Sequence, residues 1–344
     1  MSAFRIGFIG AGANTTSRHI PGLKATGAVE FVSVANRSPE SSARVAAEFG
    51  IARVAPSPEA LIADPDVDAV CIGTWPYKHR EYTVAALAAG KHVLCEARMA
   101  GTLAEAREMH AAAALRPNLV AQLVPAPFDF RLGPTITRMI EEGVLGDIVE
   151  VMVTVFNGGG LDPARPAHWR ERSVYSGRNV MMLGIFNEVL QRWLGDTTRV
   201  VASGRVVVPE RTDDATGQLV PIDVPDSFGV FAEIARGARV TYAFSAVAQG
   251  AAAPGIALYG TRGTLHWTMG DTARWALHGE AWIDLAPDLG TDRGWRVEID
   301  FVESVRDGAP VRLTTFDDGL RYMAFIDAAW KSWQMGVACS VETA

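Results

Sequence analysis

Two closely spaced glycines follow an apolar run at the start of the chain. The run ends in Phe8-Ile9-Gly10-Ala11-Gly12, and Ala13, Asn14 and Thr15 then open a helical stretch. Gly10 permits a tight turn, and Gly12 lets the backbone approach a pyrophosphate, which would face the N–H groups of the following helix. Thr15 replaces the usual third glycine and loosens the match. The position between a strand and a helix still predicts a dinucleotide-binding turn.

The end of the second expected strand bears on which dinucleotide is bound. It reads Ala35-Asn36-Arg37-Ser38. Sites that prefer NAD usually carry an Asp or Glu here for the ribose 2′-hydroxyl, whereas Arg and Ser side chains suit a 2′-phosphate. The segment therefore favours NADP over NAD, with NAD still possible. The alternative is that Arg37 is a solvated loop residue.

The elements that must position this turn alternate along the first third of the chain. Apolar strand-like runs span residues 5–9, 30–35, 69–73, 92–95 and 119–124, and helical stretches span 15–26, 39–49, 58–62, 79–89 and 103–114. This alternation is typical of a parallel sheet covered by helices on both faces. It predicts an α/β Rossmann domain, a doubly wound parallel sheet, over residues 1–123.

The pattern changes near Pro125, where strands begin to dominate. Strands are expected at residues 148–156, 200–208, 227–234, 239–246, 257–259 and 264–267, with helices at 134–142, 180–194 and 319–333. Residues 124–344 are therefore expected to form an α+β domain with a mostly antiparallel open sheet. Two irregular stretches remain, 158–176 and 209–225, and the first is the better candidate for a substrate loop.

Composition excludes several classes of partner. The chain has 344 residues, a formal net charge of −7 and 21% charged residues, so it lacks the basic face that nucleic acids and acidic membranes require. No apolar stretch is long enough to span a bilayer, and no export signal is expected. Three scattered cysteines suit neither a disulfide framework nor a zinc site, so the sequence predicts a cytoplasmic protein without a bound metal.

Several further segments resemble one family. They are Thr74-Trp75-Pro76 with His79, the run from Ala86 to Glu96, the segment from Ile256 to Leu265, the segment from Asp300 to Gly308, and the last helix from Gly319 to Ser332. Together they resemble the Gfo/Idh/MocA oxidoreductases over nearly the whole chain. The resemblance implies that Thr74, Trp75, Pro76, His79 and Glu96 lie on the cofactor side of the site.

The same resemblance implies an activity and an assembly. Family members pass a hydride between the nicotinamide and a C–OH carbon of a sugar, polyol or related small molecule, while a Lys, Asp or His manages the hydroxyl proton. Their second-domain sheet often mediates oligomerisation. We therefore expect a small-molecule substrate and a homo-oligomer, a dimer or tetramer, formed through that sheet.

This chain departs from the family at the positions that handle protons. After Glu96 the family's lysine and proline positions are Ala97 and Arg98. On the helix near residue 186, the family's Asp, His and Asp positions are Met182, Phe186 and Val189, which share one face at spacings of four and three. Arg98 cannot exchange protons near neutral pH, although it can bind a carboxylate, a phosphate or a developing alkoxide.

Other residues remain as candidates for the missing chemistry. His168 is the best available acid or base, Tyr175 is second, and Asn179 joins the Phe186 face if the helix already includes it. The candidate catalytic residues are His168, Arg98, Asn179 and Tyr175, and the candidate substrate residues are Trp169, Arg170, Met182, Phe186 and Glu188. Glu188 points about 200° away from Phe186 at 100° per residue, so a structural role is also open.

Three functions are compatible with this pattern. The first is an NADP-dependent dehydrogenase or reductase with a rearranged proton relay, acting on a less polar substrate than a free sugar. The second uses the cofactor transiently to cleave a glycoside without net redox change. The third is a nucleotide-dependent sensor without catalysis, since the glycine turn persists while the proton-transferring positions are lost.

Overall fold

The computed structural model describes residues 4–249, 253–291 and 294–342. Contacts divide it into two compact units, residues 1–125 with 296–320, and residues 126–295 with 321–344. The first unit thus includes residues 296–320, which the sequence reading grouped with the second domain. The reason is apolar packing: the rings of Phe4 and Phe301 lie 6.3 Å apart, and Gln122 donates a hydrogen bond to the Val297 carbonyl.

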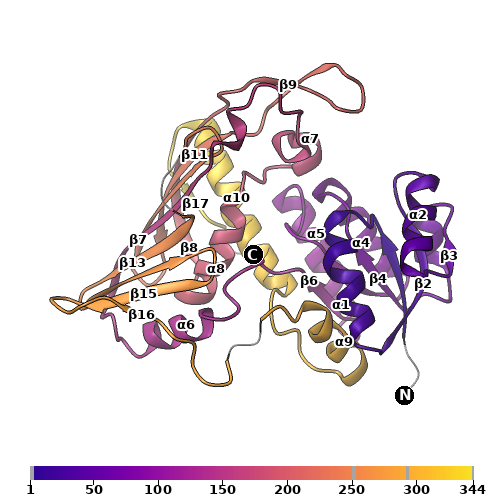
Figure 1. Cartoon of the computed structure of the whole chain (residues 1–344), viewed down its shortest axis with the longest axis horizontal. Coiled ribbons are helices and arrows are strands. Elements are labelled where there is room, and N and C mark those ends of the chain that lie inside the picture. The colour runs from indigo at the N-terminus through magenta and orange to yellow at the C-terminus, as the bar shows by residue number, and fades with distance from the viewer. Residues whose placement is uncertain (1–3, 250–252, 292–293, 343–344) are drawn as a thin grey trace. The chain divides into compact units, whose positions relative to one another are not determined.

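A six-stranded parallel sheet forms the centre of the first unit (Figure 1). Its strands are β1 (Phe4–Ile9), β2 (Val29–Ala35), β3 (Arg53–Val54), β4 (Ala69–Ile72), β5 (His92–Cys95) and β6 (Ala121–Leu123). They lie in the order β3-β2-β1-β4-β5-β6, with parallel pairing throughout. This is the doubly wound order, so the predicted Rossmann domain is confirmed.

Helices connect these strands along the chain, and one further helix, from the distant segment at residues 297–307, joins them in the first unit. They are α1 (Ile20–Ala25), preceded by a π-helical turn (Thr15–His19), α2 (Pro39–Phe49), α3 (Pro58–Ala63), α4 (His79–Ala88), α5 (Leu103–Ala114) and α9 (Val297–Asp307), with a short 3-10 turn at Pro76–Lys78. The Ser38 side chain caps α2, and Thr102 and Glu105 form a capping box on α5. Caps of this kind let the sequence predict α2 and α5 at their observed bounds.

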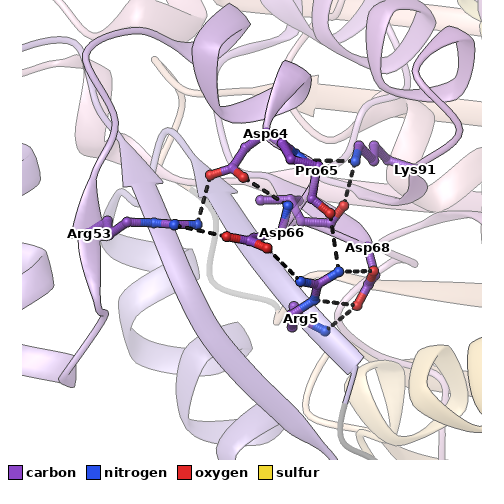
Figure 2. A network of polar contacts seen from close by, with 8 residues as sticks. Arg5, Arg53, Asp64, Pro65, Asp66, Asp68 and Lys91 are labelled. Atoms are coloured by element: carbon purple, nitrogen blue, oxygen red, sulfur yellow. Dashed lines mark hydrogen bonds and ion pairs between the residues drawn. The ribbon is translucent and has the colours of Figure 1, made fainter.

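Ion pairs connect β1 and β3 with the loop before β4 (Figure 2). Arg5 contacts both Asp66, at 2.9 Å, and Asp68, at 3.0 Å, and Arg53 contacts Asp66 and Asp64. The buried Lys91 donates to the carbonyls of Asp64 and Val67. This network fixes the loop before β4 at the amino end of the sheet, the edge opposite the strand carboxyl ends.

A nine-stranded sheet forms most of the second unit. Its order is β16-β15-β14-β13-β7-β12-β11-β8-β17, and all pairs are antiparallel except β12 with β7. The strands are β7 (Ile148–Phe156), β8 (Thr197–Arg205), β11 (Ser227–Ile234), β12 (Arg239–Ser245), β13 (Gly255–Gly260), β14 (Gly263–Thr268), β15 (Thr272–Leu277), β16 (Ile283–Asp284) and β17 (Cys339–Ser340). The predicted open, mostly antiparallel sheet is confirmed.

Helices cover one face of this sheet. They are α6 (Gly133–Glu141), α8 (Leu183–Leu194) and the second-unit part of α10 (Phe316–Met335), while α7 (Ser173–Ser176) and 3-10 turns at Gly158–Gly160 and Trp169–Glu171 lie in a long connection. Tyr242 of β12 packs on Phe325 of α10 with rings 5.3 Å apart. On the opposite face, Phe231 and Val201 are 67% and 46% exposed. The alternation of buried and exposed residues therefore indicates that helices cover one face of the sheet and leave the other exposed.

Two sequence expectations differ from the structure here. The stretch 209–225, expected to be irregular, contains a small hairpin of β9 (Glu210–Thr212) and β10 (Leu219–Pro221). The helix expected from residue 180 begins only at Leu183, after Met181 adopts a φ of +42°. Over the described residues, no helix is both long and apolar enough to cross a bilayer.

Candidate active site

The carboxyl ends of β1, β2 and β4 surround a cavity of about 520 Å³ in the first unit. Three short segments supply most of its walls: Ile9–Gly12, Ala35–Ser38 and Gly73–Trp75, joined by Ser41, Pro58, Tyr77, Lys78 and Tyr82. In a doubly wound sheet, the crevice beside the first strand is where the order of the strands reverses and where ligands bind. The predicted glycine turn therefore lies in a cavity of suitable place and size.

The backbone of the glycine turn is held by its neighbours. Gly10 has a φ of +73°, and a Cβ there would come within 2.5 Å of the Thr74 side chain. A Cβ on Gly12 would meet only the Gly10 carbonyl, at 3.9 Å, so open space lies above this residue. The turn thus has the strained glycine and the uncovered glycine that pyrophosphate binding requires.

Asn36 braces this turn from the end of β2. Its side-chain oxygen accepts a hydrogen bond of 2.7 Å from the Ala11 N–H, and its amide donates to the Ser41 hydroxyl. Asn36 was predicted to contact the cofactor; in the structure its side chain positions the loop that would do so. Two buried hydroxyls beside the turn, those of Thr15 and Thr74, have no hydrogen-bond partner among the described residues. Because these two oxygens are shielded from solvent, they belong to the interior side of the turn.

Cations rather than carboxylates line the cavity after β2 and after β4. Arg37 is exposed, lines the cavity and makes no ion pair or hydrogen bond with the described part of the chain. Lys78 also lines the cavity. Its ammonium lies 2.5 Å from a carboxylate oxygen of Glu81 and 5.6 Å from the centre of the Tyr82 ring. The Ser38 hydroxyl, by contrast, is engaged in capping α2. No Asp or Glu is among the described residues that form this wall.

Glu96, at the end of β5, is the centre of a buried polar cluster. Its carboxylate accepts hydrogen bonds from the Asn14 amide and from His19, whose Nε2 lies 2.8 Å away. The other ring nitrogen of His19 lies 2.6 Å from Glu298 of α9. Burial would lower the pKa of His19, but Glu298 and Glu96 raise it to about 9. Burial would raise the pKa of Glu96, but His19 and Asn14 lower it to about 2.

Arg98 lies in the tight turn after Glu96. The turn contains a cis peptide bond between Ala97 and Arg98, and the Arg98 side chain is 9% exposed. The wholly buried His79 lies 2.9 Å from both the Arg98 carbonyl and the Thr74 carbonyl. His79 therefore ties the end of β5 to the loop after β4, through Thr74 and not through Trp75 or the buried Pro76.

His168 belongs to the second unit, where it starts a short 3-10 turn. Its Nδ1 accepts a hydrogen bond of 3.3 Å from the Arg170 N–H, and Glu171 completes a capping box with its backbone. Burial, followed by the charge of Arg170, lowers the pKa of His168, so the imidazole is neutral near pH 7. With Nδ1 accepting, the neutral ring carries its proton on Nε2.

Aromatic and arginine side chains cluster beside His168. The Arg170 guanidinium lies 4.2 Å from the Trp169 ring centre, and the Arg172 guanidinium lies 5.0 Å from that of Tyr175. The hairpin β9–β10 braces this loop through Arg211, which donates to the carbonyls of Gly160, Asp162 and Arg165. The predicted substrate loop is thus an ordered segment supported by the second irregular stretch.

The α8 candidates have other neighbours. Phe186 is fully buried, and its ring packs on Phe128, Phe244 and Trp267 at 5.1–6.5 Å. Glu188 is also buried, and its carboxylate accepts hydrogen bonds from the Ala126 N–H at 3.0 Å and from Arg192 at 2.9 Å. These two side chains stabilise the interior of the second unit.

Met182 and Asn179 lie just ahead of α8. Met182 is half-buried, and its carbonyl accepts a hydrogen bond from the Phe186 N–H. Asn179 precedes the helix by four residues and donates to the Ser176 carbonyl at 2.5 Å. The helical-face argument that linked Asn179 to Phe186 therefore does not apply, because the helix does not include it.

Comparisons with known proteins support this organisation. Residues 4–122 match the model of an oxidoreductase family with an NAD-binding Rossmann fold, and residues 135–266 match the Gfo/Idh/MocA C-terminal domain. The chain belongs to the Gfo/Idh/MocA oxidoreductase family.

Similar relatives match this chain over different lengths. A 1,5-anhydro-D-fructose reductase of Ensifer adhaerens is 49% identical over 109 residues, 32% of each chain. A levoglucosan dehydrogenase of Pseudarthrobacter phenanthrenivorans is 28% identical over 224 residues, 60% of this chain and 56% of the relative. The matches thus span about a third and just over half of these relatives. A solved levoglucosan dehydrogenase complex with NADH and levoglucosan has a TM-score of 0.85 at 23% identity, covering 99% of this chain and 100% of the other, which shows a shared fold.

Sequence reasoning missed two residues of the cofactor half. Neither His19 nor Glu298 was among the candidate site residues. Only the pairing of a buried His with two distant carboxylates reveals them, and a separation of 279 residues hides that pairing in the sequence. One local signal existed: a Cβ on Gly22 of α1 would lie 2.8 Å from the Glu298 side chain, so a glycine inside a short helix marks the contact.

Proposed function

We propose that this protein is an NADP-dependent oxidoreductase that interconverts a hydroxyl and a carbonyl group on a sugar, polyol, glycoside or related small molecule. The observation that carries the proposal is the cavity at the carboxyl ends of β1, β2 and β4, with its braced glycine turn. Family membership and the sugar-related names of the relatives supply the substrate class. The two buried free cysteines fit a reducing compartment such as the cytoplasm.

The residues of the first unit fit a dinucleotide in distinct roles. When bound, the nicotinamide cofactor supplies the hydride chemistry. Gly10, Gly12 and the start of the following helix (Ala13 to Thr15) would hold the pyrophosphate, while Asn36 keeps that turn in place. Thr74 and Trp75 would contact the nicotinamide half, next to Glu96.

The cofactor preference rests on Arg37. An unengaged guanidinium in the cavity lining, which also includes Lys78 and, among the described residues, no acidic side chain, suits a 2′-phosphate. We expect Arg37→Ala to weaken NADPH binding by about tenfold to a hundredfold while NADH binding changes little, since a charged hydrogen bond contributes roughly 1.5–3 kcal/mol. Fluorescence titration measures both dissociation constants, and Arg116→Ala in the same unit is the control. An unchanged NADPH/NADH ratio would remove Arg37 from this role.

A turnover assay tests the activity itself. Under the proposal, absorbance at 340 nm changes when the protein is mixed with NADPH and a panel of sugar-derived carbonyl compounds, or with NADP and the corresponding alcohols. Product without net absorbance change, but only with cofactor present, would indicate non-redox glycoside cleavage. Binding of cofactor without turnover on any substrate would indicate a sensor.

We propose that the loop around His168 supplies the proton-transferring group, with Tyr175 as the second candidate and with Asn179 as a group that polarises the substrate oxygen. Arg98, in the first unit, is a separate candidate that would bind an anionic group. The His168 Nε2 is the ring atom left for substrate, because Nδ1 accepts from the Arg170 backbone. His168→Gln should lower kcat by about a hundredfold to ten-thousandfold with a smaller effect on cofactor affinity. If kcat and its pH profile stay the same, His168 serves only to cap its turn.

We propose that the open face of the nine-stranded sheet joins two copies of this chain. A groove there combines the apolar Val201 and Phe231 with two acids and two bases, Glu150, Glu233, Arg199 and Arg239. Such a patch is self-complementary across a two-fold axis. Light scattering during gel filtration should show an oligomer that Phe231→Glu converts to a monomer, whereas Leu115→Glu, an exposed position of the first unit, should not. A monomeric wild type would refute the interface.

A further inference from the structure

The side chains of His19, Glu96 and Glu298 form a buried cluster of charged groups. Its three side chains come from the first helix, the end of β5 and α9, and they are 0%, 14% and 3% exposed. Gly22 leaves the space that the Glu298 side chain occupies. All three groups belong to the first unit, so the cluster is a property of the cofactor half alone.

The proton count of the cluster fixes its charge. Both nitrogens of His19 lie within 2.8 Å of a carboxylate oxygen. A neutral imidazole has one N–H, so the second contact requires one more proton, on the ring or on a carboxyl group. A protonated His19 with two carboxylates and a neutral His19 with one carboxylic acid both leave the cluster one net negative charge. The raised pKa of His19 and the lowered pKa of Glu96 favour the first arrangement.

The position of the cluster relates that charge to one half of the dinucleotide. Strand β2, beside Asn36 to Ser38, belongs to the adenosine side of a doubly wound site. Strand β5 lies beyond β4 on the other side of β1, so its carboxyl end belongs to the nicotinamide side. Asn14, which follows the glycine turn directly, donates to Glu96 and connects the cluster to that turn.

The two redox states of the cofactor differ in charge at this end. The oxidised nicotinamide ring carries a positive charge, and the reduced ring is neutral. A fixed negative charge in a poorly solvated place therefore binds the oxidised ring more strongly than the reduced one.

We propose that His19 and Glu298 hold Glu96 within a singly negative cluster that makes this protein favour the oxidised over the reduced cofactor. This inference rests on the proposed function, since it requires that the cavity bind a nicotinamide dinucleotide. Glu298 and His19 act as positioning residues that set the preference between redox states. By favouring the oxidised form, the cluster makes the bound reduced cofactor a stronger hydride donor, and the equilibrium on the enzyme moves toward reduction of the carbonyl.

The test measures binding rather than turnover. NADP+ and NADPH are titrated separately into the full chain, and the ratio of the two dissociation constants is compared between variants; NAD+ and NADH are titrated in the same way. The double variant Glu96→Gln/Glu298→Gln leaves the cluster without a negative charge, whether or not His19 is protonated, and alters no residue of the cavity wall. We expect it to weaken NADP+ binding on the order of tenfold, the factor that two unit charges roughly 12 Å apart produce at an effective dielectric constant near 20, with NADPH binding changed less than about twofold.

Two further variants complete the test. Glu298→Gln alone, titrated at a pH low enough to keep His19 protonated, should shift the ratio in the same direction, and it carries the test if the double variant does not fold. Glu48→Gln, an exposed position at the end of α2, removes an equal charge elsewhere in the unit and should leave the ratio as in the wild type.

The possible outcomes are distinct. Equal losses of NADP+ and NADPH affinity, or an unchanged ratio in the folded double variant (or in Glu298→Gln at low pH if the double variant does not fold), would show that the cluster only supports the fold and would overturn the inference. A ratio that shifts equally in Glu48→Gln would also overturn it, because the effect would then belong to the net charge of the protein. A wild type that binds none of the four nucleotides would instead overturn the proposed function, and the inference with it.

Discussion

The two units use their buried polar groups in different ways. In the first unit these groups converge on the carboxyl ends of the strands, where Asn36 braces the glycine turn and His19 connects Glu96 to Glu298. In the second unit they hold the unit's own segments together, as Arg211 does for the loop at residues 160–165 and Glu188 does for the backbone at Ala126. The cofactor half has kept its polar constellation, while the α8 positions of the other half have become apolar core.

The strongest test of this comparison is at Phe186, the position that the family resemblance assigns to a histidine. Phe186→Ala should lower the free energy of unfolding by about 3–5 kcal/mol, because a fully buried ring within an aromatic cluster leaves a cavity. Denaturant unfolding measures this loss, and Leu161→Ala, 52% exposed in the same unit, is the control. If Phe186→His proved as stable as the wild type, the position would tolerate a polar catalytic side chain and the contrast would fail.

The next largest effect should be a pH dependence of the free energy of unfolding, which arises from His19 in the first unit. The folded-state pKa of His19 is about 9 against an ordinary value of 6.5, so its stabilising contribution is complete below pH 6.5 and is lost as the pH rises to 9. The loss is at most about 3 kcal/mol. Chemical unfolding between pH 6.5 and 9.5 should therefore show a decline that His19→Gln abolishes and Glu48→Gln retains. The same decline in both variants would point to other groups.

Arg211 tests whether the second unit's charges are structural. Its guanidinium is 1% exposed and binds three carbonyls, so Arg211→Met should cost about 2 kcal/mol. The loop at residues 158–176 should also become sensitive to limited proteolysis, whereas the exposed Arg205→Met should change neither property. Loss of activity without any change in loop protection would mean that Arg211 contributes to the site itself.

The same contrast explains what the sequence allowed us to predict. Strands, caps and the glycine turn are local signals, so the sheet of the first unit, α2 and α5 could be predicted closely. The place of α9 in the first unit and the contact of Glu298 with His19 depend on pairings across most of the chain, which no local pattern reports. Asn179 was expected on the Phe186 face only if the helix included it, and α8 begins after it, at Leu183, behind a residue with positive φ, Met181.

The smallest effect should come from charges of the first unit that lie away from the site. The carboxylate of Asp68 accepts from both the side chain and the backbone N–H of Arg5 (Figure 2), and the Arg5 hydrogen bond lowers the pKa of Asp68. Because the side chains of Arg5 and Asp68 are both more than a third exposed, solvent and salt screen the pair. Asp68→Asn should lower the thermal midpoint by about 1–2 °C at low salt, less at 1 M salt, and not at all below the pH where Asp68 itself protonates.

Lys91 holds the same loop through buried carbonyl contacts, so Lys91→Met should cost more and show no such salt dependence. If Asp68→Asn instead changed cofactor affinity, polar groups at the amino end of the sheet would be coupled to the site, and the separation between structural and site-directed charges would not hold even within the first unit.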